Sequence, residues 1–119
     1  MRRLSRDPNV LLPLKHSTYR VLLALADGEL RHGYAIMQAV SEMSGGKETI
    51  LPGTLYAALA RMVDEGLVEE KDADDSSGGP RRRYYRRTVF GRAVARAESE
   101  RLQALLDIAL AQNLTGGRK

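Results

Sequence analysis

The residues best suited to chemistry in this sequence are arginine, threonine and tyrosine side chains. Three consecutive arginines occupy positions 81–83, after a stretch rich in glycine and serine. A guanidinium group presents its N–H donors in a fixed plane that matches phosphate oxygens. A second group follows Pro52, where Thr54 and Tyr56 carry hydroxyls that can bond to a base edge or a phosphate. Together these residues indicate binding to an anionic polymer.

The composition excludes the common catalytic and metal-binding sites. The 119 residues contain no cysteine, which excludes disulfides, thiol nucleophiles and most structural zinc sites. The two histidines, His16 and His32, are distant in sequence, and neither accompanies a carboxylate in a motif. A hydrogen bond at the start of a helix is the simpler role for His32. No glycine-rich phosphate motif is present, so we expect no enzymatic activity, no metal and no cofactor.

The charge balance favours an anionic partner such as nucleic acid. The chain has a net charge of +4 and an isoelectric point of about 9.7. Its apolar stretches, such as residues 21–26, are too short to span a bilayer. The arginines near the N-terminus are not followed by the apolar run of a signal peptide. We therefore expect a cytoplasmic protein that does not bind membranes.

Hydrophobic periodicity and turn residues predict three short helices in the first half of the chain. The first spans 17–26 with Ser17 as N-cap, and the second spans 33–43. The third spans 52–65, because Pro52 suits the first position of a helix and a glycine follows at the end.

The periodicity changes after Gly66. Residues 67–71 and 81–87 read as strands, and residues 72–80 form a polar loop between them. The helical period returns from Thr88 onward. Three helices, a hairpin and a long helix are the elements of a winged helix-turn-helix, so the predicted class is mainly α (α+β) with a long C-terminal dimerisation helix.

This order predicts three segments: an N-terminal arm at 1–14, a winged helix-turn-helix DNA-binding domain at 15–88 and a C-terminal dimerisation helix at 89–114. Residues 10–12 of the arm are apolar and available to dock on the core. The last helix carries an apolar stripe without a partner in its own chain, and we expect a two-fold mate to cover it. The predicted interface residues are Leu102, Leu105, Leu106, Ala109 and Leu110.

The third helix is the candidate recognition helix. Its apolar stripe at Leu55, Leu59, Met62 and Val63 faces inward.

The opposite face is then expected to carry Thr54, Ala57, Ala58 and Arg61, with Tyr56 at the edge. A helix fits the major groove, and its N-terminal residues reach the base edges first. Thr54 suits a base edge or a thymine methyl, Ala57 lets the backbone approach, and Arg61 suits a guanine or a phosphate. In the alternative interpretation, Tyr56 packs on the second helix and Arg61 is merely solvated.

The remaining candidates contact phosphates. Tyr34 and Gln38 lie in the first two turns of the second helix, which crosses the backbone in this motif. In the alternative interpretation the Tyr34 ring is half-buried in the core, and both can hold because a tyrosine has an apolar body and a polar tip. The arginines of the hairpin face the DNA while its aspartates point away, or the loop is simply solvated. The full set of predicted DNA-binding residues is Tyr34, Gln38, Pro52, Gly53, Thr54, Tyr56, Ala57, Arg61, Arg81, Arg82 and Arg83.

Three motifs also resemble a known family. They are Leu30-Arg31-His32-Gly33-Tyr34-Ala35-Ile36, Leu51-Pro52-Gly53-Thr54-Leu55-Tyr56 and Gly79-Pro80-Arg81-Arg82-Arg83-Tyr84-Tyr85. Their order and spacing over roughly residues 16–95 are similar to those of PadR-type transcriptional regulators. The resemblance implies a winged-helix repressor that dimerises through its C-terminal helix and sometimes responds to small phenolic or drug-like ligands. The chain departs from the family at Arg87, where an apolar residue is usual. It also has no tryptophan to stack on flat drugs.

The leading hypothesis is therefore a homodimeric repressor of the PadR type that binds an inverted-repeat operator in double-stranded DNA. Its two recognition helices would enter successive major grooves roughly 34–36 Å apart. The sequence does not identify a small-molecule effector. The alternative is a winged-helix module for protein–protein contact without DNA binding, and salt dependence distinguishes the two because phosphate contacts release counterions.

Overall fold

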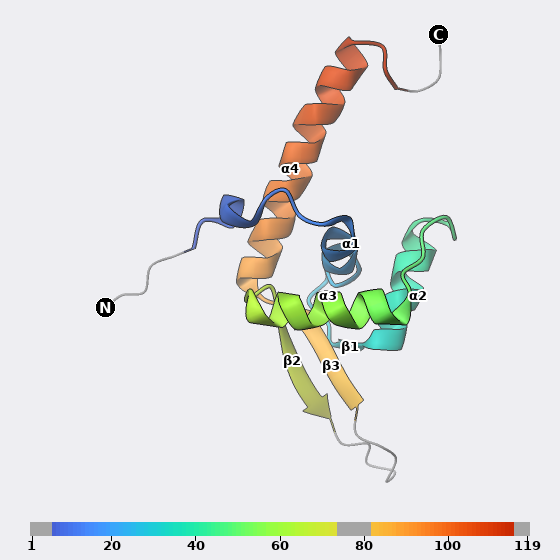
Figure 1. Cartoon of the computed structure of the whole chain (residues 1–119), viewed down its shortest axis with the longest axis vertical. Coiled ribbons are helices and arrows are strands. Elements are labelled where there is room, and N and C mark those ends of the chain that lie inside the picture. The colour runs from blue at the N-terminus through green and yellow to red at the C-terminus, as the bar shows by residue number, and fades with distance from the viewer. Residues whose placement is uncertain (1–5, 74–81, 116–119) are drawn as a thin grey trace.

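The computed structural model describes residues 6–73 and 82–115, and it confirms the predicted fold class (Figure 1). Four α-helices and a small antiparallel sheet follow a 3₁₀ turn in the arm. The elements are η1 (Pro8–Leu11), α1 (His16–Ala24), β1 (Arg31–His32), α2 (Gly33–Met43), α3 (Pro52–Asp64), β2 (Val68–Ala73), β3 (Arg82–Arg87) and α4 (Val89–Ala111). The sheet order is β1-β3-β2, with both pairs antiparallel.

The core lies where α1, α2 and α3 meet the sheet and the first turns of α4. Its largest fully buried side chains are Val21, Leu22, Leu25, Ile36, Val40, Leu55, Leu59, Met62, Leu67 and Val94. Fully burying one such side chain stabilises the fold by roughly 1.5–3 kcal/mol. Because every major element contributes, the core fixes the angle of α3 relative to α2 and to the hairpin.

Both ends of α3 follow from local sequence. Pro52 occupies its first turn, where a missing N–H has no cost. At the other end Gly66 adopts a positive φ of 79°, which glycine reaches without steric strain. The N–H of Leu67 then donates to the carbonyl of Met62 at 2.8 Å, and the N–H of Gly66 donates to that of Val63 at 3.1 Å. This cap turns the chain sharply from α3 into β2.

The junction between β3 and α4 is also tightly specified. The Thr88 hydroxyl donates to the carbonyl of Gly66 at 2.6 Å and accepts from the N–H of Gly91 at 2.8 Å. A Cβ at Gly91 would overlap the carbonyl oxygen of Leu67, so only glycine permits this approach. The junction therefore sets the direction of α4, whose C-terminal half stands clear of the other elements (Figure 1).

The N-terminal arm docks between the end of α3 and the start of α4. The Arg6 guanidinium donates to the carbonyl of Glu65 and lies 4.2 Å from the centroid of the Phe90 ring. Leu11 and Leu12 pack against the core as expected, whereas Val10 is 68% exposed, so its predicted docking is wrong. Val10 points outward because the 3₁₀ turn places its neighbours, and not Val10 itself, on the inner side.

A buried carboxylate on α4, Glu98, links this helix to the arm. Glu98 is only 3% exposed and receives two hydrogen bonds at 2.8 Å from Arg101, one turn further along α4. Its carboxylate also accepts from the backbone N–H of Leu14. The hydrogen bonds from Arg101 hold the pKa of Glu98 below its usual range, although burial acts in the opposite direction.

Several local expectations differ from the structure. Helix α1 begins at His16 after Lys15, so Ser17 is not its N-cap. Strand β1 is not apparent in the sequence pattern, because its two residues become a strand only by pairing with β3. Arg87 crosses to the end of α1, where it donates to the carbonyl of Ala26 at 3.2 Å. This bond accounts for a charged residue at the end of the second wing strand.

Candidate nucleic-acid interface

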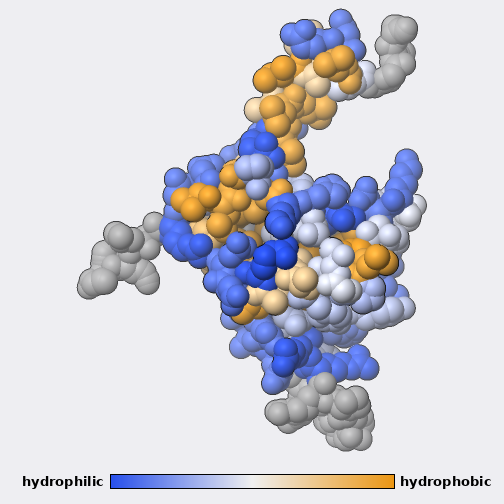
Figure 2. All heavy atoms as spheres, in the orientation of Figure 1, coloured by the Kyte–Doolittle hydropathy of each residue, from blue (hydrophilic) through white to orange (hydrophobic). Residues whose placement is uncertain are grey.

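The outward face of α3 is free of other parts of the described chain. Pro52, Gly53 and Thr54 in its first turn are exposed, and so is Ala57 one turn later. Figure 2 shows pale and orange atoms across the middle of the molecule, where α3 lies in Figure 1, with strongly hydrophilic atoms around them. The expected exposure of Ala58 is wrong, since its side chain is fully buried. At 100° per residue, Ala58 falls on the same side of the helix as Leu55 and Met62.

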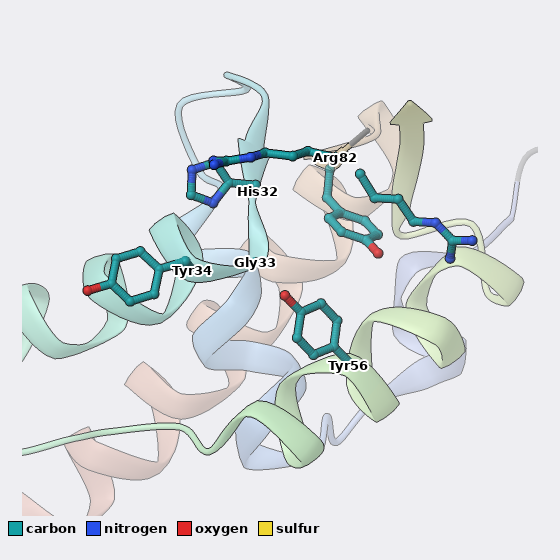
Figure 3. A pocket seen from close by; sticks show the side chains of 7 residues that line it. His32, Gly33, Tyr34, Tyr56 and Arg82 are labelled. Carbon is teal, nitrogen blue, oxygen red and sulfur yellow. The ribbon is translucent and has the colours of Figure 1, made fainter. Parts of the chain in front are cut away.

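A cleft of about 530 Å³ lies beside α3, between the start of α2 and strand β3 (Figure 3). Its lining comes from three separate elements: His32, Gly33 and Tyr34 at α2, Tyr56 on α3, and Arg82, Arg83 and Tyr85 on β3. The fold thus brings aromatic and basic residues from each of the three sequence motifs to one place.

Tyr56 connects the two helices of the helix-turn-helix. Its hydroxyl lies directly against the backbone of Gly33, where a Cβ would overlap it (Figure 3). The ring nevertheless stays 48% exposed. Tyr56 therefore packs on α2 and also keeps a surface toward the cleft, and its contact with DNA stays a prediction.

His32 is the N-cap of α2. Its Nδ1 accepts a hydrogen bond at 3.2 Å from the N–H of Ala35, which confirms the simple hydrogen-bonding role expected for this histidine. An accepting Nδ1 requires the neutral ring to carry its proton on Nε2. The ring stacks near Tyr34, with centroids 6.5 Å apart, and meets the edge of Tyr84 at 5.7 Å. These contacts join the start of α2 to strand β3 beside the cleft.

The wing strand supplies the cations of the cleft. Arg82 and Arg83 are both exposed, and they lie opposite Ala73 and Asp72 on β2. Arg83 also forms an ion pair with Glu70, with Nε and Oε2 3.0 Å apart. Arg81 and the loop aspartates Asp74 and Asp75 lie outside the described residues. The predicted orientation of the wing tip therefore stays a prediction.

Two acidic groups near the sheet are engaged by arginines of the same region. Asp27 pairs with Arg31 through two hydrogen bonds of 2.8 and 2.9 Å, and these bonds hold the pKa of Asp27 far below its usual range. Glu69 pairs with Arg86, which lowers the pKa of that carboxyl. Both carboxylates thus stay ionised at neutral pH, and the guanidinium groups of Arg31 and Arg86 balance their negative charges.

The other residues predicted to contact DNA differ in their exposure and in their position relative to the cleft. Tyr34 is 61% exposed, so its ring is not half-buried in the core as the alternative interpretation held, and the core residue of this turn is Ile36. Gln38 is exposed on the same helix. Arg61 is half-buried on the flank of α3 that faces Leu14 and the arm, away from the cleft. A role for Arg61 in binding DNA stays a prediction.

Two exposed residues of the α3 surface were not among the predicted contacts. Leu51, the N-cap residue of α3, is 71% exposed, and Ala60 is exposed one turn beyond Ala57. The spacing of Ala60 from Ala57 could have identified it, since residues three apart share a helix face. Leu51 gives no such signal because it precedes the first helical residue.

The apolar stripe of α4 is uncovered within the described chain. Leu105, Leu106 and Leu110 are about half exposed, at 50%, 45% and 54%, and Leu102 is 37% exposed. Ala109 is half-buried, and Ile108, which was not predicted, is 59% exposed beside them. Figure 2 shows this surface as orange atoms along the upper end of α4. Large apolar surfaces of this kind mark interaction sites.

In residues 6–73 and 82–115, a metal site would need clustered ligand side chains and a membrane span would need a long apolar helix. No group of three or more His, Asp or Glu side chains in these ranges is arranged to hold a metal ion. None of the helices described there has both the length and the apolar content needed to cross a membrane.

The sequence profile of the transcriptional regulator PadR-like family matches residues 21–97, which include the helix-turn-helix, the hairpin and the start of α4. This chain belongs to the PadR-like family of transcriptional regulators. The resemblance predicted from the three motifs is thereby confirmed.

Solved PadR-family structures share this fold. A PadR family transcription regulator from Clostridium difficile R20291 is 25% identical, with a TM-score of 0.72 over 85% of this chain and 100% of that one. A PadR-family regulator from Eggerthella lenta is 27% identical, with a TM-score of 0.67 over 81% and 82%. The PadR protein of Bacillus subtilis, solved in complex with operator DNA, is 20% identical and matches in fold, with a TM-score of 0.61 over 74% and 47%.

Two curated proteins are similar in sequence, and neither carries a functional name. An uncharacterized 37.1 kDa protein in transposon TN4556 of Streptomyces fradiae is 41% identical over 88 residues, or 71% of this PadR-like chain. Uncharacterized protein X of Lysinibacillus sphaericus is 36% identical over 73 residues, or 61% of the chain. The matched regions span only 22% and 66% of these two relatives.

Proposed function

We propose that this PadR-like chain is a cytoplasmic, sequence-specific DNA-binding repressor that acts as a homodimer on an inverted-repeat operator. The observation that carries the proposal is the free outer face of α3 with the arginine-lined cleft beside it. The family membership supports regulation of transcription.

In this proposal α3 enters the major groove with its first turn toward the base edges. The start of α2 lies against the phosphate backbone, where the exposed Tyr34 hydroxyl and the Gln38 amide can donate to phosphate oxygens. Arg82 and Arg83 meet the next stretch of backbone or the minor groove. The cleft of about 530 Å³ between these groups has the volume to hold a phosphate between α2 and the wing.

The dimer follows from the uncovered stripe of α4. A two-fold mate is the simplest partner, because most soluble oligomers are symmetric. Each protomer would then present one recognition helix to its half-site, with the half-sites roughly 34–36 Å apart or a multiple of that distance. A dimer bound to such an operator represses by occupying the promoter region.

Replacing Arg82 and Arg83 together with alanine tests the wing contacts. We expect affinity for duplex DNA to fall about tenfold or more at low salt, and the slope of log K against log salt to flatten by about one to two, since each lost phosphate contact retains about 0.9 counterion. Fluorescence anisotropy at several salt concentrations measures both quantities.

A control with Arg92→Ala and Arg96→Ala removes the same charge from α4. We expect this control to keep the wild-type slope, provided that sedimentation shows it is still a dimer. An unchanged slope in the wing variant would remove the wing from the interface. Salt-independent or absent DNA binding by the wild-type protein would contradict the proposed function and favour a protein-docking module.

A further inference from the structure

The exposed face of α3 carries no charged or amide side chain in its first two turns. From Pro52 to Ala60 the sequence contains no charged side chain and no side-chain amide. The exposed positions of this stretch are Pro52, Gly53, Thr54, Tyr56, Ala57 and Ala60. The first charged residue, Arg61, is half-buried on the flank that faces the arm.

This composition limits the ways in which α3 can read bases. Guanine is usually recognised by arginine or lysine, and adenine by the amide of asparagine or glutamine. None of these side chains stands on the exposed face of the first two turns. Besides the hydroxyls of Thr54 and Tyr56, the face presents methyl groups on Thr54, Ala57 and Ala60. The apolar feature of the major groove is the C5-methyl group of thymine, which alanine and threonine methyls contact.

We propose that α3 recognises thymine methyl groups, with Thr54, Ala57 and Ala60 as the specificity-determining residues. The inference rests on the proposed DNA-binding function and adds the chemistry of its readout. Successive residues of this set are three apart, or about 4.5 Å along the helix axis. This rise exceeds the 3.4 Å separation of neighbouring base pairs by only about 1 Å, so two of these residues are within reach of adjacent thymines.

The small size of these residues supports a DNA groove over a protein surface as the occupant. A side chain that ends at Cβ makes contact only if the backbone itself approaches the bases, which an uncovered helix can do. Protein hot spots instead use large aromatic or arginine anchors. The cations Arg82 and Arg83 flank the face across the cleft, where they suit phosphates on either side of a groove.

Replacing thymine with deoxyuridine provides the direct test, because it deletes only the C5-methyl group. The wild-type protein first selects its preferred site from random duplex DNA, and each thymine of a half-site is then substituted singly. We expect a contacted thymine to lose about fourfold in affinity on substitution, which is the contribution of one buried methyl group. Thymines outside the region covered by α3 serve as internal controls.

Two variants at position 54 identify the protein side of the contact. Thr54→Ser deletes the methyl and keeps the hydroxyl, and Thr54→Val does the reverse. We expect Thr54→Ser to abolish the deoxyuridine penalty at one thymine, and Thr54→Val to preserve it. Each comparison is made within one variant, so a change in its overall stability cancels.

The outcomes separate this inference from the proposed function. Specific binding with no deoxyuridine penalty at any position would overturn methyl recognition and leave DNA binding intact. A preferred half-site without thymine would also overturn methyl recognition. A deoxyuridine penalty that persists in Thr54→Ser and disappears in Thr54→Val would overturn the assignment of the contact to the Thr54 methyl group. If no duplex is selected, both the readout and the proposed function fail.

Discussion

Replacing Leu105 with glutamate should convert the dimer to monomers and abolish tight binding to a full operator. Leu105 is 50% exposed at the centre of the apolar stripe of α4. In a two-fold dimer the variant would bury one unpaired carboxylate from each protomer, at a cost of about 3–5 kcal/mol. The dissociation constant of the dimer should therefore rise by at least about two orders of magnitude.

Loss of the dimer should carry over to DNA. The second half-site contact is intramolecular only in a dimer, so its loss removes about 10²–10⁴ in affinity without altering α3. Sedimentation velocity measures the dimer, and circular dichroism confirms that the helices persist. The affinity of the variant for an isolated half-site should stay close to that of the wild-type protein for the same half-site, because α3 is unchanged.

Ala104→Glu is the matched control, because Ala104 is exposed on the opposite side of the same helix segment. It introduces the same charge one residue away, and we expect it to leave the dimer intact. If Leu105→Glu also sediments as a dimer, the stripe on α4 is not the dimer interface.

Gly91→Ala should be the most destabilising single-methyl addition in the described chain. The new Cβ would overlap the backbone carbonyl of Leu67, and backbone cannot move aside as a flexible side chain can. Restoring contact distances requires α4 to shift, which strains the Thr88 hydrogen bonds that hold the junction. We expect a loss of about 3 kcal/mol in the free energy of unfolding, or failure to fold.

Gly53→Ala is the control for this prediction, since no atom lies within 4 Å of a Cβ built there. Alanine is favoured over glycine in a helix by up to about 1 kcal/mol, so this variant should unfold at the wild-type midpoint or above it. Urea unfolding monitored by circular dichroism compares the two. Equal midpoints for both variants would show that α4 does not rest on Leu67 as described.

The elements that were predictable from sequence are those governed by local rules. Helix α2 spans the predicted residues 33–43, and α3 ends one residue before the predicted 65. Pro52 and Gly66 mark the ends of α3 through backbone preferences that act without tertiary context. The hairpin and the long last helix were likewise visible as changes of hydrophobic period.

The features that escaped prediction depend on contacts between distant segments. Strand β1 exists only because β3 lies beside it. Glu98 is buried, although a glutamate on a helix surface is usually solvated, because Arg101 and the docked arm satisfy its carboxylate. The cleft combines residues about 50 positions apart in the sequence. Hydrophobic periodicity could therefore identify Tyr56 and Arg82 as candidates, but it could not predict that they lie close together in space.

Selection of bound sequences from random duplex DNA by the wild-type protein tests the central claim most directly. If the free face of α3 reads DNA in a symmetric dimer, the enriched sequences will share an inverted repeat with half-site centres one helical turn, or a whole number of turns, apart. No enrichment above the input library would contradict the claim that α3 is a DNA-reading helix.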